Sequence, residues 1–444
     1  MLEFITSTDP RILISVTFVV LMLFGAPVAF SVGMAGFVYF ATSNIYPMSI
    51  GVQQIATVSQ SFPLLAVPFF VLAGHLMNES GITDRLFNFS RIAVGWMSGG
   101  LAHVSILLST LMGGVSGSAV ADAAMEARVI GPQMVADGYS KGYSASVIAL
   151  SSLITATIPP SIGLILYGYV GNVSIGRLFM AGIIPGLLMM FTLMFTAYII
   201  AKKRKYVSAD SKLPTAKEMG KAAWNAKWAL LFPVFLFFSI KPLPFMELKR
   251  ALFTPSEVGS FAVIYAILIG TLAHKTMSWE SIKRAFGHAL SDIGLIMLII
   301  VMSGMIGKGI IVMQIPQSIA SALLDGMSDP RAIIAVILVS LFVAGLFLES
   351  TILVLLLTPI FVPVIVAVGV DPVHFGILMM TIVTLGSMTP PVGVAMYVVC
   401  SLMDTPVEEY IKESVPFLIA ILALVTALLF LPDVVLWLPR LVYG

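Results

Sequence analysis

The sequence predicts an all-α polytopic membrane protein, and three observations carry that prediction. The 444-residue chain is 59% hydrophobic and only 10% charged, whereas a soluble domain carries about 25% charged residues. Its apolar runs approach the roughly 20 residues that a helix needs to cross a bilayer. The runs are continuously apolar rather than alternating, which favours helices over a membrane barrel.

The first half of the chain contains apolar segments that are repeatedly interrupted by Gly, Ser or Pro. The first run is broken at Gly25–Pro27 and forms either one bent span or two short spans joined by a tight turn. Its first charges, Glu3 and Asp9, are not typical of a signal peptide, so we expect the run to stay in the membrane. The segments in order are Ile12 to Phe40, Phe62 to Met77, Leu101 to Met112, Ala119 to Val135, Tyr143 to Val170 and Leu178 to Ala201.

A strongly basic loop, residues 202–227, follows this half. It carries eight Lys or Arg residues against Asp210 and Glu218. The positive-inside rule therefore predicts that the loop is cytoplasmic. It also separates the two halves of the chain.

The second half repeats the plan of the first. Two of its apolar segments are short and flank a polar tip, Glu349 to Thr351. Another segment is broken by a Pro-Pro pair. The segments in order are Trp228 to Ile240, Val258 to Ala273, Ile293 to Val312, Ala332 to Phe347, Ile352 to Val368, Phe375 to Leu402 and Phe417 to Leu431.

The two halves match at a fixed offset of 231 residues. Six Gly or Pro positions coincide without a gap, including Gly114 with Gly345 and Pro159-Pro160 with Pro390-Pro391. So many coincidences are not expected by chance and predict an internal duplication. Many secondary transporters contain such repeats, inverted relative to each other in the membrane.

The breaks predict two re-entrant hairpins, near 100–135 and 332–368, and two unwound helices, near 154–161 and 386–393. A broken helix inside a bilayer leaves backbone groups whose burial costs several kcal/mol each. Free carbonyl and hydroxyl oxygens suit a hard cation such as sodium. Half-helix N-termini suit an anionic group of a substrate. The alternative is that these Gly and Ser residues only allow close helix packing.

Two acidic residues lie at the predicted hairpins. Asp122 follows Ser118 by one turn and either meets a cation or proton or lies at the wet mouth of the hairpin. Glu349 lies at the tip of the second hairpin and is either functional, as intramembrane ionisable groups often are, or a cap of the following half-helix.

Other chemistries find no support in the sequence. The five His residues lack metal-site spacing, the single Cys400 excludes an internal disulfide, and there is no Walker A motif. No nucleophile–base constellation stands out, and no basic block suggests nucleic acid. We therefore expect neither an enzyme nor a bound cofactor.

The residues resemble a known family, the large membrane subunit of tripartite ATP-independent periplasmic (TRAP) transporters. The resemblance covers essentially the whole chain. It is carried by Ser116–Ala124, Ile158–Tyr167, Ser174–Gly186, Thr254–Glu257, Ile315–Ile319, Thr358–Phe361, Asp371–Gly376 and Thr389–Gly393.

The resemblance implies the fold of the ion-transporter superfamily, with two inverted repeats and an elevator mechanism. It implies a sodium-coupled importer in the bacterial inner membrane that works with a small four-helix membrane subunit. A soluble periplasmic binding protein would deliver an organic acid, such as a C4-dicarboxylate, sialic acid or a related carboxylate.

The resemblance also implies two sodium sites, each where a hairpin tip meets an unwound helix. Site 1 would comprise Ser116, Gly117, Ser118, Thr155, Thr157 and Pro159. Site 2 would comprise Ser350, Thr351, Gly386, Met388, Thr389 and Pro390. The candidates for substrate contact are Ser118, Asp122, Ser161 and Glu349. The family commonly has Asp where this chain has Glu349.

We expect a division into scaffold and moving parts along the chain. The scaffold would comprise 1–58 and 178–275, and the transport domain 59–177 and 276–412, with 413–444 as a C-terminal helix. A stand-alone sodium- or proton-coupled carboxylate symporter or exporter of the same superfamily is the main alternative, and a channel is a second. The sequence does not identify the acid.

Overall fold

The computed structural model describes residues 10–444 except 44–45, 207, 209–211, 241–252 and 328. Every regular element in these ranges is helical. Six helices are long and apolar enough to cross a membrane, or seven if the bent pair α13 and α14 counts as one span. The prediction of an all-α polytopic membrane protein is therefore confirmed.

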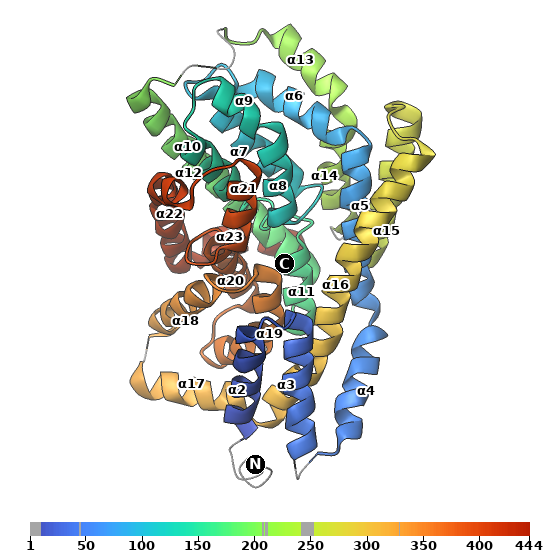
Figure 1. The fold of residues 1–444 in the computed structure, drawn as a ribbon, viewed down its shortest axis with the longest axis vertical. Helices are drawn as coiled ribbons and strands as arrows, with labels where there is room; N and C mark the ends of the chain where they lie inside the picture. The colour runs from blue at the N-terminus through green and yellow to red at the C-terminus, as the bar shows by residue number, and fades with distance from the viewer. Residues whose placement is uncertain (1–9, 44–45, 207, 209–211, 241–252, 328) are drawn as a thin grey trace.

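The first half begins with two short helices, α2 and α3, that lie side by side (Figure 1). Gly25, with a φ of +77°, lies in the turn between them. The run from Ile12 to Phe40 is thus two short helices rather than one bent span. The helices of this half are α2 (Pro10–Leu23), α3 (Val28–Thr42), α4 (Met48–Ser59), η1 (Phe62–Leu65), α5 (Ala66–Glu79), α6 (Ile82–Val94), α7 (Gly100–Gly113), α8 (Ala119–Val129), α9 (Gly131–Ala136), α10 (Lys141–Ser151), α11 (Ile162–Val170) and α12 (Ile175–Arg204).

The second half begins with α13 and α14, which meet at a bend of 70°. Residues 241–252, which follow the apolar segment that ends at Ile240, lie outside the described residues. The helices of this half are α13 (Ala216–Asn225), α14 (Lys227–Ile240), α15 (Pro255–Leu268), η3 (Ile269–Ala273), α16 (Trp279–Val312), α17 (Ile315–Gly326), α18 (Pro330–Gly345), α19 (Ser350–Ala367), α20 (Pro372–Ser387), α21 (Val394–Leu402), α22 (Val407–Phe430) and α23 (Pro432–Tyr443).

Helix boundaries in the two halves follow the 231-residue offset. Helix α8 begins at Ala119 and α19 at Ser350; α10 begins at Lys141 and α20 at Pro372. The hairpin of α7 and α8 lies in the upper half of Figure 1, and that of α18 and α19 lies in the lower half. This placement is what inverted repeats would produce, although the inversion itself stays a prediction.

The packing of the helices is also paired between the halves. Helix α3 packs against α16, and α15 packs against α5. The second helix of each hairpin contacts the second part of the other half's broken helix, α8 with α21 and α19 with α11. The hairpins and broken helices of the two halves therefore form one interlocked body, beside the group of α3, α4, α5, α15 and α16 (Figure 1).

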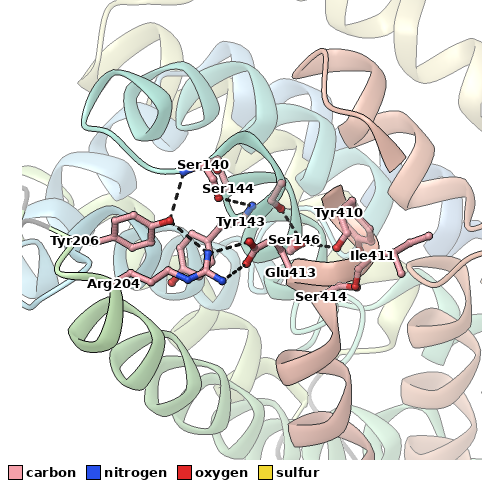
Figure 2. A network of polar contacts seen from close by, with 11 residues as sticks. Ser140, Tyr143, Ser144, Ser146, Arg204, Tyr206, Tyr410, Ile411, Glu413 and Ser414 are labelled. Carbon is pink, nitrogen blue, oxygen red and sulfur yellow. Dashed lines mark hydrogen bonds and ion pairs between the residues drawn. The ribbon is translucent and has the colours of Figure 1, made fainter. Parts of the chain in front are cut away.

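A network of polar contacts joins α10, α12 and α22, and Figure 2 shows it from close by. Two guanidinium nitrogens of Arg204 lie 2.9 and 2.8 Å from the two carboxylate oxygens of Glu413. The Ser146 hydroxyl donates to the carbonyl of Tyr410 at 3.0 Å. These contacts place Tyr410 for the interaction with the second broken helix that is described below.

Candidate functional site

The first hairpin tip touches the first unwound segment, as the sequence predicted. Helix α7 ends at Gly113, and Ser118 caps α8 by accepting from the Ala121 N–H at 3.4 Å. Gly117, with a φ of +64°, takes a left-handed conformation that glycine adopts most readily. Its carbonyl accepts a 3.4 Å bond from the N–H of Ile162. The tip therefore lies against the backbone between α10 and α11.

The second tip meets the second unwound segment in the same way. The carbonyl of Leu346 accepts bonds of 3.2 Å from the N–H groups of Val392 and Gly393. Gly345 and Gly386 approach so closely that a Cβ on Gly386 would lie 2.7 Å from the Gly345 Cα. Both breaks contain a cis Pro-Pro bond, Pro159-Pro160 and Pro390-Pro391.

A cavity of about 450 Å³ opens between the two tips and the helices α5 and α16. A smaller pocket of about 50 Å³ adjoins it directly between the tips. Ser118, Glu349 and Thr351 line both spaces. Two tips converging on one partly polar cavity are suited to holding a small polar ligand, because such sites combine apolar walls with a few placed polar groups.

Glu349 acts as the N-cap of α19. One of its carboxylate oxygens accepts from the hydroxyls of Ser350 and Thr351, both at 2.9 Å, and the other accepts from the Thr351 N–H at 2.8 Å. The capping alternative is therefore what the structure shows. The capping side chain also lines the cavity, and a functional role for Glu349 stays a prediction.

Asp122 lies elsewhere, inside the first hairpin. It is only 1% exposed and does not line the cavity. One carboxylate oxygen accepts from the Thr155 hydroxyl at 2.6 Å, and its other oxygen has no hydrogen-bond partner. The alternative that Asp122 lies at a solvent-exposed mouth of the hairpin is therefore wrong, because its side chain is buried and joins the hairpin to the unwound segment.

Glu126, one turn after Asp122, is buried beside it on α8 and was not singled out from the sequence. Its carboxylate accepts from the hydroxyls of Ser105 and, at 2.8 Å, Ser109. Ser151 hydrogen-bonds both of these hydroxyls, at 3.2 and 3.1 Å. We call Asp122, Glu126, Ser105, Ser109, Ser151 and Thr155 the hairpin 1 polar cluster. The spacing of Asp122 and Glu126 on one helix face was the available signal.

The remaining predicted residues are placed as follows. Ser161 is buried outside the cavity and caps α11, accepting from the Leu164 N–H at 3.2 Å. The hydroxyls of Thr157 and Thr389 donate to carbonyls of their own segments, Leu153 and Leu385. Each tip contacts its unwound segment, through Gly117 in the first half and Leu346 in the second, and sodium binding at either predicted site stays a prediction.

Tyr410 is a further residue that sequence reasoning missed. Its side chain is fully buried, and its hydroxyl donates to the carbonyl of Met388 at 2.8 Å. Met388 belongs to the second predicted sodium site, so Tyr410 fixes one of that site's candidate oxygens. No local sequence pattern joins the two residues, because the contact spans 22 positions and two helices.

Replacing Tyr410 by Phe keeps the ring but removes this donor. We expect a loss of about 1 kcal/mol in stability and a several-fold rise in the sodium concentration that half-saturates uptake. The measurement is uptake as a function of sodium. Tyr397→Phe, at a half-exposed ring with no described hydrogen bond, is the matched control, and equal behaviour of both variants would contradict the expectation.

Paired helical hairpins, broken helices and a cavity between the hairpin tips are typical of membrane transport proteins. The family model of the tripartite ATP-independent periplasmic transporter, DctM component, matches residues 15–434. The chain belongs to this family, whose large permease subunits are multi-pass inner-membrane proteins. They work with a small membrane subunit and a periplasmic binding protein.

Individual relatives agree with this assignment. The chain is 35% identical to the sialic acid TRAP transporter large permease protein SiaM of Vibrio cholerae, over 96% of this chain and 97% of that one. It is 32% identical to the isethionate TRAP transporter permease protein DctMQ of Oleidesulfovibrio alaskensis, over 96% of this chain and 66% of that one. The fold is similar to that of the Alcanivorax borkumensis YdaH transporter, with a TM-score of 0.63, 12% identity and coverage of 86% and 87%.

Proposed function

We propose that this chain is the large subunit of a sodium-coupled importer of a small organic acid. The observation that carries the proposal is that each hairpin tip contacts its own unwound segment, and both tips face one cavity. Such junctions present backbone carbonyls and hydroxyls that suit a monovalent cation. They also direct the N-termini of α8 and α19 toward a bound anion.

An elevator-type movement fits the way the helices pack. The hairpins and broken helices interlock across the two halves, while α3, α4, α5, α15 and α16 pack on one another. The first group, which includes both hairpin tips, can move as one body against the second. We propose that this movement alternates access. In this proposal α5 and α16 lie on the fixed side, although both were expected on the moving side.

Family membership supports the proposed partners and class of substrate. The described relatives are named for sialic acid and isethionate, both small organic acids. We propose that a small membrane subunit and a periplasmic binding protein serve this chain as well, with sodium as the coupling ion.

The test is uptake of radiolabelled organic acids into proteoliposomes that contain this chain and its small subunit. We expect uptake only when the loaded binding protein and an inward sodium gradient are both present. Uptake with sodium alone would instead favour the stand-alone symporter. Full uptake without sodium would contradict the coupling.

A further inference from the structure

The cavity between the hairpin tips has an unusual set of ionisable groups for a site that receives an acid. His75 from α5, Asp292 from α16 and Glu349 from the second tip line it. No Lys or Arg is among the described residues that line it. Arg284, two turns before Asp292 on α16, is held by Glu79 through contacts of 2.7 and 3.0 Å. An incoming acid group therefore meets two carboxylates and one imidazole.

The two carboxylates are already engaged by their neighbours. Both oxygens of Glu349 accept bonds from Ser350 and Thr351 at the start of α19. Asp292 lies 2.8 Å from Nε2 of His75. An anion in a cavity with mainly apolar walls needs a charged or hydrogen-bonding partner, because burying it without one is costly. Among the described residues that line the cavity, His75 is the one whose side chain can supply a positive charge.

The contact with Asp292 suits His75 for this role. It uses Nε2, which leaves Nδ1 as the second donor of the protonated ring. A carboxylate that contacts one ring nitrogen fixes the orientation of the imidazole. The ring of His288 stacks at 6.2 Å from that of His75 without lining the cavity, and it therefore provides a matched control.

We propose that His75 binds the acid group of the transported substrate, and that Asp292 is the positioning residue that orients the imidazole. Among the described residues that line the cavity, one side chain can carry a positive charge and two are carboxyl groups, so the cavity suits a substrate with a single acid group. A second acid group would face Glu349, and two like charges at short range oppose each other. The inference rests on the proposed import of an organic acid.

The experiment measures binding directly on the purified complex of this chain with its small subunit, by calorimetry in saturating sodium. The probes are N-acetylneuraminate, gluconate and isethionate, each with one acid group, and succinate, with two. We expect at least one single-acid probe to bind more tightly than succinate. His75→Gln should weaken that binding by roughly 10- to 100-fold, the range for losing a hydrogen bond to a charged group. His288→Gln should leave it unchanged.

Asp292→Asn tests the positioning role. We expect it to raise the half-saturating concentration for uptake while the maximal rate stays close to wild type, and Asp292→Glu to restore part of the affinity. Combined with His75→Gln, it should weaken binding no further, because residues that act through one contact are not additive. Thermal unfolding of each variant checks that the fold is retained.

The outcomes separate this inference from the proposed function. The inference is overturned if His75→Gln leaves the affinity unchanged, or if succinate binds more tightly than every single-acid probe. Sodium-driven uptake by the wild type would still support the proposed function in either case. A wild-type complex that neither binds nor takes up any probe with sodium and binding protein overturns both.

Discussion

Replacing Gly117 by Ala is expected to reduce sodium-driven uptake on the order of 100-fold. A Cβ at this position would overlap the carbonyl oxygen of Pro160, so the tip must move away from the unwound segment. The φ of +64° adds strain of about 1–2 kcal/mol for a residue with a side chain. The overlap with Pro160 adds an overpacking cost of about 1–3 kcal/mol. We therefore expect the contact between the tip and the unwound segment, at the first predicted sodium site, to open.

Gly138→Ala separates the two causes. Gly138 has a φ of +87°, and nothing lies within 4 Å of a Cβ built there, so this variant reports backbone strain without the collision. We expect it to retain most of the uptake. Sodium titrations of both variants in proteoliposomes provide the measurement. If both lose uptake equally, strain rather than the closeness of the tip to Pro160 explains the effect.

Sequence reasoning located the breaks because Gly, Ser and Pro are conspicuous in apolar surroundings. Gly117 and the Pro159-Pro160 pair lie where the prediction put a tip and an unwound helix, and the offset of 231 residues reappears in the starts of α8 and α19. Such features depend on local backbone preferences, which a sequence shows directly.

The side-chain contacts that support the site could not be predicted from such local sequence patterns. Tyr410 and Met388 lie on different helices, and His75 and Asp292 are 217 positions apart. A lone His in a membrane protein is more often a packing residue, so its pairing becomes visible only once α5 and α16 are placed together. Asp122 was recognised as unusual, but its burial depends on how α8 packs against the unwound segment.

The two hairpins carry different types of residue at corresponding positions. At the offset of 231 residues, Asp122 and Glu126 of the first hairpin correspond to Leu353 and Leu357 of the second. Ser105, which donates to Glu126, corresponds to Val336. The first hairpin is thus joined by hydroxyl–carboxylate hydrogen bonds, whereas the second has apolar residues at the corresponding positions. Both tips nevertheless contact their unwound segments through backbone hydrogen bonds.

Replacing Glu126 by Ala is expected to lower the free energy of unfolding by about 3 kcal/mol. The side chain is fully buried, so its truncation leaves a cavity and deprives the hydroxyls of Ser105 and Ser109 of their acceptor. In a chain of this size we expect the midpoint of thermal unfolding to fall on the order of 5 °C. The measurement is made on the complex in nanodiscs.

Glu126→Gln is the matched variant, because it keeps the volume and the side-chain carbonyl while its amide can donate to a hydroxyl that turns to accept. We expect its unfolding midpoint to stay close to that of the wild type. If Gln is as damaging as Ala, the cluster depends on the carboxyl group itself rather than on its shape and hydrogen bonds. If neither variant loses stability, the hydroxyls find other acceptors, and the polar cluster does not hold the first hairpin together. Retained stability with lost uptake in Glu126→Gln would instead place the cluster in the transport cycle, where the leucines of the second hairpin have no equivalent role.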